Sequence, residues 1–160
     1  MDYALTDKDL SRFGRVVLYK QLATFKDVDR LLKNGVCFIL YNIQSDNSGH
    51  WTCLTKRNRH TLDYFDSYGW KPDTNQKKYS DRPYVDNYLS MLLKKSPYDI
   101  HYNDVDYQKM DDDIATCGRH CLYRSLNKEL NEEQYKKKLD AYGEDYDQLI
   151  VELTRPIIGK

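Results

Sequence analysis

The sequence lacks any apolar run near the roughly 20 residues that a membrane-spanning helix needs. Residues 1–7 have neither the basic start nor the apolar stretch of a secretory signal. We therefore expect no membrane partner and a reducing compartment. In such a compartment the four cysteines are thiols and not a disulfide framework.

Charge of one sign is also missing, because 25 basic and 25 acidic side chains balance each other. A neutral chain creates no overall field that attracts nucleic acid or an anionic surface. Internal repeats, low-complexity tracts and long linkers are absent as well. The 160 residues suffice for one core, so we predict a single domain over 1–160 that acts as a monomer.

Helical spacing of apolar residues recurs along the chain and predicts several helices. In the first of them, Thr6 is placed to cap the helix and Leu10, Phe13 and Val17 share one face. The predicted helices cover residues 6–20, 27–34, 81–95, 117–130, 131–142 and 144–153.

Short apolar or alternating runs predict four strands, over residues 36–41, 50–56, 61–66 and 99–107. The polar residues 57–60 between the second and third strands indicate a hairpin. Together the elements predict an α+β fold, with a small mixed sheet flanked by helices.

The arrangement of His50, Asp66 and Cys117 carries the strongest chemical signal. Cys117 is predicted to begin a helix after Thr116, a good capping residue. There the helix dipole and free N–H groups stabilise a thiolate and an oxyanion. His50 and Asp66 fall near the same end of the two hairpin strands, within reach of each other. A base oriented by a carboxylate and placed beside a thiol predicts nucleophilic catalysis.

The remaining cysteines have simpler explanations. Cys37 and Cys53 lie inside predicted strands and are expected to be small core residues, and Cys121 lies one helical turn inward from Cys117. A zinc site formed by Cys117, His120 and Cys121, joined by His50 and Cys53, is the alternative of a different class. It ranks second, because structural zinc ligands usually come as two close pairs. An inactive binding module of the same fold is a third possibility.

Several short stretches together resemble the adenain-like and SUMO-protease-like cysteine peptidases. They are Gly49-His50-Trp51, residues 65–69, Gln108 and Thr116-Cys117-Gly118. Residues 65–69 and 112–121 are similar to proteases of virophages and large DNA viruses. This resemblance implies that Cys117 is the nucleophile and that His50 is the general base and then the general acid. It also implies that Asp66 orients His50 and that Gln108 donates a hydrogen bond to the oxyanion. It also implies that Trp51 and Gly118 contact substrate.

The resemblance further implies a papain-related core in circularly permuted order and cleavage after glycine, with no cofactor. The short chain favours maturation of capsid or other virion precursor proteins over the alternative, a deubiquitinase or deSUMOylase type of isopeptidase. The expected location is the host cytoplasm or virus factory, or the virion itself. Neutral charge gives no support to the DNA cofactor of the adenovirus enzyme.

One departure from the family concerns Gln108. Eight residues, 109–116, separate it from Cys117, and family members commonly have a shorter interval. The acidic residues 111–113 are expected to bulge out and leave Gln108 in place. The other interpretation of Gln108 is an ordinary polar residue at a strand end.

Overall fold

A five-stranded mixed sheet forms the centre of the protein in a computed structural model, which describes residues 3–42, 49–73, 87–110 and 115–160. The strands follow one another in chain order across the sheet. β2 and β3 pair antiparallel, as do β3 and β4, whereas the outer pairs are parallel. The strands are β1 Arg15–Leu18, β2 Val36–Asn42, β3 Gly49–Lys56, β4 Thr61–Asp66 and β5 Asp99–Tyr102. The predicted α+β class, with helices flanking a mixed sheet, is confirmed.

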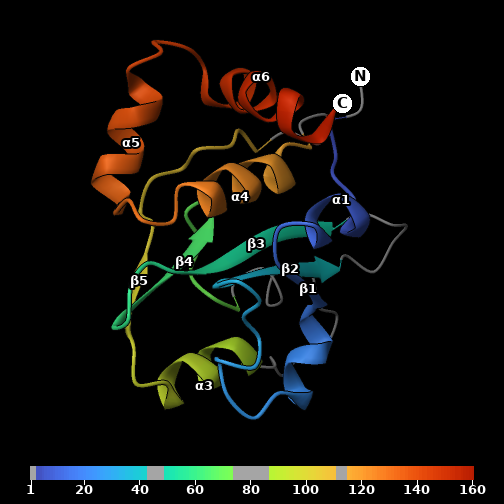
Figure 1. Cartoon of the computed structure of the whole chain (residues 1–160), viewed down its shortest axis with the longest axis vertical. Helices are drawn as coiled ribbons and strands as arrows, with labels where there is room; N and C mark the ends of the chain where they lie inside the picture. The colour runs from blue at the N-terminus through green and yellow to red at the C-terminus, as the bar shows by residue number, and fades with distance from the viewer. Residues whose placement is uncertain (1–2, 43–48, 74–86, 111–114) are drawn as a thin grey trace.

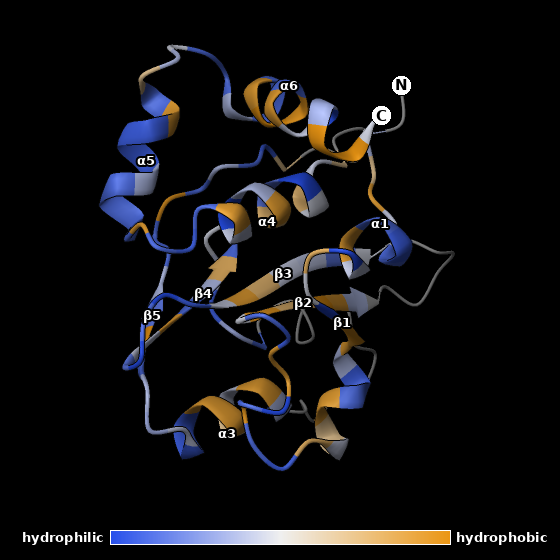
Figure 2. Ribbon diagram, in the orientation of Figure 1, coloured by the Kyte–Doolittle hydropathy of each residue, from blue (hydrophilic) through white to orange (hydrophobic). Residues whose placement is uncertain are grey.

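Helices cover both faces of the sheet, as Figure 1 shows. One face packs against α4 (Cys117–Leu126) and the elements beyond it, α5 (Glu132–Asp140) and α6 (Tyr146–Ile158). The other face packs against α3 (Tyr88–Lys95) and the 3-10 helix η1 (Tyr19–Thr24). Figure 2 shows that α5 is largely hydrophilic, and it buries only Tyr135 and Leu139. None of the described helices is both long and apolar enough to cross a bilayer.

The predicted helix over residues 6–20 is wrong beyond its first turns. Thr6 does cap α1 (Asp7–Ser11), and a reciprocal pair of hydrogen bonds joins it to Asp9. The chain then enters β1, where Val17 lies opposite Ile39 of β2. Parallel pairing with a distant strand, together with the preference of β-branched residues for strands, overrides the helical spacing.

The helix predicted over residues 27–34 is also wrong, because this segment forms turns. Its apolar residues Val28 and Leu31 are nevertheless buried in the core. The turns end at Asn34 and Gly35, whose φ angles of 55° and 75° lie in the left-handed region that a helix cannot continue through.

The remaining predictions differ mainly in their ends. The hairpin of β3 and β4 is confirmed, but β5 stops at Tyr102, short of the predicted 107. α4 stops at Leu126, short of the predicted 130, and the Leu126 side chain is exposed. α6 continues to Ile158, beyond the predicted 153. Of the helix predicted over 81–95, residues 81–86 lie outside the described residues and the described part forms α3.

The entry into β1 provides a test of this fold. A Cβ atom placed on Gly14 would lie 2.6 Å from Cγ1 of Val36. We expect Gly14→Ala to lower the free energy of unfolding by about 1–3 kcal/mol, because the core must shift to admit the methyl group. Urea denaturation measures this change. The control Lys8→Ala, on the exposed side of α1, should change stability by less than about 0.5 kcal/mol. Equal stabilities of the two variants would contradict the packing described.

Candidate active site

The β3–β4 pairing brings His50 and Asp66 together. Thr52 lies opposite Asp66 in the register, and His50 is two residues earlier on the same face of β3. The His50 Nε2 and Asp66 Oδ1 atoms are 2.8 Å apart. Both residues are buried, with 3% and 0% of their surface exposed. The geometry expected from the hairpin is therefore present.

Cys117 reaches the same place as the first residue of α4. Its Sγ atom accepts a hydrogen bond from the backbone N–H of Trp51 at 3.5 Å, and His50 lies close enough to lower the pKa of the thiol. Because Nε2 of His50 faces Asp66, Nδ1 is the ring nitrogen that remains for the thiol. The structure thus joins three residues that lie on two strands and a helix into a Cys–His–Asp arrangement.

Local hydrogen bonds control the charge of the thiol. Burial by itself raises the pKa of Cys117, but hydrogen bonds from His50 and from the N–H groups of Trp51 and Gly118 bring that pKa below its ordinary value. Burial likewise lowers the pKa of His50, whereas its bonds to Asp66 and Cys117 raise that pKa to about 10. Opposite shifts of the two partners favour a thiolate–imidazolium pair at neutral pH.

Asn103 holds Asp66 in position, and the sequence analysis missed it. The Asn103 side chain accepts the Asp66 N–H at 3.0 Å and donates to the Asp66 carbonyl at 2.6 Å and the Val105 carbonyl at 3.0 Å. The Asp66 carboxylate also accepts the N–H of Tyr68. A single asparagine after a strand carries no recognisable pattern, so only the fold reveals this role.

An aromatic pair covers the imidazole ring of His50. Tyr68 stacks on it with ring centroids 4.6 Å apart and planes at 14°. Trp70 packs against Tyr68 in turn, with a centroid distance of 5.0 Å. These residues lie two and four positions after Asp66, and that proximity is the one signal from which their role could have been inferred.

Gln108 lies beside the Asp66 segment. Its backbone N–H donates to the Ser67 carbonyl at 3.0 Å, and its side-chain Oε1 accepts the Ser67 hydroxyl at 2.5 Å. The second bond fixes the orientation of the buried amide, so that its NH₂ group is directed away from Ser67. Ser67 therefore holds Gln108 in place, although eight residues separate Gln108 from Cys117. The predicted bulge over 111–113 lies outside the described residues.

The structure corrects the predicted role of Thr116. Thr116 does precede the first turn of α4, but its side chain makes no capping hydrogen bond. Its hydroxyl instead donates to Asp147 Oδ1 at 2.6 Å. The backbone N–H groups of this turn are therefore not capped by Thr116, and the Gly118 N–H serves the thiolate.

Trp51 and Gly118, predicted to contact substrate, lie against Leu5. The Trp51 indole Nε1 donates to the Leu5 carbonyl at 3.2 Å. A Cβ atom on Gly118 would lie 3.1 Å from Leu5 Cβ and 3.2 Å from Trp51 Cδ1, so a side chain here would crowd both. Glycine thus permits the close packing of α4 on β3. A contact with substrate stays a prediction for both residues.

The alternative zinc site finds little support. Across 3–42, 49–73, 87–110 and 115–160, no three His, Cys, Asp or Glu side chains are grouped to hold a metal ion. His120 instead bonds Asp147, with Nε2 and Oδ1 3.0 Å apart. The Cys121 thiol donates to the Trp51 carbonyl, and the Cys53 thiol to the Cys121 carbonyl.

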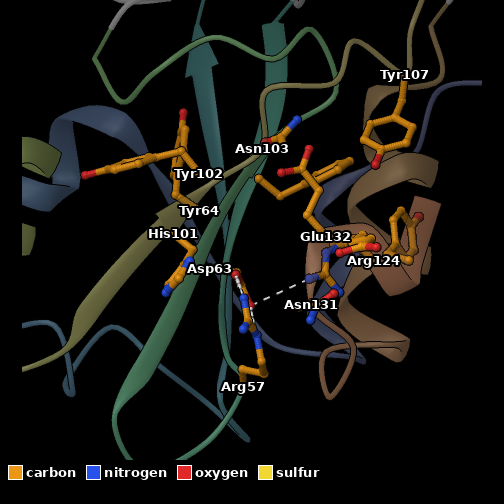
Figure 3. Close-up of a pocket in the computed structure, with 13 residues that line it drawn as sticks. Arg57, Asp63, Tyr64, His101, Tyr102, Asn103, Tyr107, Arg124, Asn131 and Glu132 are labelled. Carbon is orange, nitrogen blue, oxygen red and sulfur yellow. Dashed lines mark hydrogen bonds and ion pairs between the residues drawn. The ribbon is translucent and has the colours of Figure 1, made fainter. Parts of the chain in front are cut away.

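A separate pocket of about 280 Å³ lies between the sheet and α5, and Figure 3 shows its polar wall. Asp63 forms ion pairs there with Arg57 and Arg124. His50, Asp66, Cys117 and Gln108 are not among the residues that line it. The hairpin therefore contributes two carboxylates with different partners, and Asp66 is the one that bonds His50.

The charge of Cys117 can be measured by alkylation. We expect iodoacetamide at pH 6 to label Cys117 before the other cysteines, because its lowered pKa extends the thiolate to more acidic pH. Burial raises the pKa of Cys37 to about 12, so that thiol should stay unreactive and serve as an internal control. His50→Ala should slow labelling of Cys117 by about tenfold or more, since each unit of pKa changes the thiolate fraction tenfold. Mass spectrometry of each cysteine gives the rates, and labelling insensitive to His50 would contradict the ion pair.

Comparisons with known proteins identify the family but no activity. No protein-family model matches the chain. The central domain of an uncharacterized Legionella pneumophila protein is a structural neighbour with a TM-score of 0.45 and 17% identity, over 99% of this chain and 98% of its own. That likeness is too low to support an argument. The uncharacterized protein V9 of Sputnik virophage is 37% identical over 156 residues, which cover 91% of this chain and 88% of that protein. The chain therefore belongs to the family of virophage protein V9.

Proposed function

We propose that this protein is a cysteine endopeptidase that cleaves virion precursor proteins, after glycine residues. The observation that carries the proposal is the buried chain of contacts from Cys117 through His50 to Asp66. A nucleophile, a base and a group that orients the base are the minimum set for acyl transfer through a thioester. The resemblance to adenain-like peptidases, including a papain-related core, adds to this proposal.

The proposed reaction begins with the thiolate of Cys117, already paired with the imidazolium of His50. The thiolate attacks the substrate carbonyl carbon, and the resulting oxyanion is stabilised by N–H groups at the start of α4 and by the Gln108 amide. His50 then gives its proton to the leaving amine. His50 next takes a proton from water, which attacks the thioester. This step releases the acid and regenerates the thiolate of Cys117 beside the imidazolium of His50.

The virophage family supports the choice of substrate. A virophage protein with a thiol hydrolase site is consistent with maturation of capsid or other virion proteins, in the host cytoplasm, the virus factory or the virion. An isopeptidase acting on ubiquitin-like conjugates is the alternative with the same chemistry. An inactive binding module is the alternative of a different class. Cleavage assays separate the three.

The test is cleavage of peptides that tile the virion proteins of a virophage. We expect products with a carboxyl-terminal glycine from the wild type and none from Cys117→Ala. The matched control Cys37→Ala removes a buried thiol on β2, away from the triad, and should keep activity. Mass spectrometry identifies the products. Cleavage by Cys117→Ala would exclude the mechanism, and cleavage only of a ubiquitin-like conjugate would favour the isopeptidase.

The role of Gln108 can be tested separately. We expect Gln108→Ala to lower kcat by about 10²–10³-fold, as loss of one oxyanion donor does elsewhere, with a small change in KM. Ser67→Ala is the informative partner variant, because it removes the hydroxyl that orients the amide but leaves the amide in place. It should cause a smaller loss. A loss below about tenfold for Gln108→Ala would return Gln108 to a structural role.

A further inference from the structure

Asp147 collects three hydrogen bonds behind the candidate active site. It lies in the first turn of α6 and is buried. Its Oδ2 atom accepts the backbone N–H of Lys109 at 2.9 Å. Its Oδ1 atom accepts the Thr116 hydroxyl at 2.6 Å and lies 3.0 Å from His120 Nε2. One carboxylate therefore joins three points of the chain.

Two of the three partners of Asp147 lie next to residues of the proposed reaction. Lys109 directly follows Gln108, and Thr116 directly precedes Cys117. Asp147 thus binds both ends of the interval 109–116. Bringing the two ends of a loop together costs conformational entropy, and bonds from one side chain to both ends offset part of that cost.

The Asp147 carboxylate is suited to hold this arrangement. Burial by itself raises its pKa, but the bonds from His120, the Lys109 N–H and Thr116 keep that pKa below its ordinary value. Hydrogen bonds to an ionised acceptor are stronger than those between neutral groups. His120 is itself buried in α4, with its backbone N–H bonded to the Thr116 carbonyl, so it anchors the carboxylate to the first turn of the helix.

We infer that Asp147 is a positioning residue for the oxyanion site, holding Gln108 at a fixed distance from Cys117. This inference rests on the proposed peptidase function. It explains how the chain accommodates the long interval between the two residues, because the link runs through α6 and not through the interval. It assigns Asp147 and its partner His120 no part in proton transfer, since His50 serves the thiol.

Two reactions of Cys117 separate this role from general stability. Alkylation by iodoacetamide needs the thiolate but forms no oxyanion, whereas peptide cleavage needs both. A residue that positions the oxyanion site should therefore affect cleavage alone. Damage to the fold or to the His50–Cys117 pair should affect both reactions.

The experiment compares the two rates in Asp147→Ala and Thr116→Val. We expect kcat for peptide cleavage to fall about 10²-fold in Asp147→Ala, close to the loss of an oxyanion donor, and about tenfold in Thr116→Val, which loses one of three bonds. Alkylation of Cys117 at pH 6 should stay within about twofold of the wild type in both, because the thiolate pair is untouched. Thr116→Ser keeps the hydroxyl and should restore cleavage.

A matched control lies in the same turn. Asp145 caps the start of α6 and forms an ion pair with Lys109 Nζ at 3.1 Å, so Asp145→Asn changes charge at the same place and keeps a capping side chain. It should leave both rates unchanged. Thr116→Val differs little in volume from the wild type, which keeps the test valid if Asp147→Ala fails to fold.

The outcomes distinguish the inference from the proposed function. Unchanged cleavage in Thr116→Val and Asp147→Ala, or equal losses of cleavage and alkylation, would overturn the positioning role. If the wild type cleaves nothing, the peptidase proposal fails by itself. Hydrogen exchange then decides whether Asp147 holds Lys109, the residue that follows Gln108. The Lys109 amide should exchange at least about tenfold faster in Asp147→Ala than in Asp145→Asn, and equal exchange would overturn the link.

Discussion

The packing of α4 on β3 is the constraint on which the candidate site depends. The backbone of Trp51 is hydrogen-bonded to two successive turns of the helix: its N–H donates to Cys117, and its carbonyl accepts the thiol of Cys121. These bonds set the register of the helix against the strand. His50 precedes Trp51 on the same strand, so the same register sets the distance from the His50 ring to the Cys117 thiol.

The opposite side of α4 is held just as firmly. Arg119 is buried, and its guanidinium donates to the carbonyls of Tyr3 and Lys160 and to the hydroxyl of Thr154. A buried cation is tolerated where several acceptors surround it. The helix is therefore clamped between β3 on one side and α6 with the segment before α1 on the other. Rigid support of this kind is what a preorganised catalytic constellation requires.

Patterns within short stretches of the sequence predicted those parts of the site that depend on short stretches of the chain. The hairpin and the order His50, Asp66, Cys117 were readable because strand alternation and a polar turn determine which residues meet. The strand β1 was missed because its partner β2 lies about twenty residues further along the chain, and periodicity within residues 6–20 favoured a helix. Asn103 and Asp147 were missed for a similar reason. Most of their partners are distant in sequence, and a single polar residue forms no recognisable pattern until the chain has folded.

The lowered pKa of Cys117 is a local effect, and the burial of the thiol explains why. With 8% of its surface exposed, the thiol lies where a lone charge is costly, so an unassisted cysteine here would stay neutral. The chain has no net charge that could compensate from a distance. Stabilisation must therefore come from groups in direct contact, and the low dielectric surroundings make each such hydrogen bond stronger than it would be in water. The same burial that opposes the thiolate thus makes its state depend steeply on His50 and on the backbone of Trp51 and Gly118. The charge of the thiol therefore depends on the position of α4, which buried polar contacts on both sides of the helix hold in place.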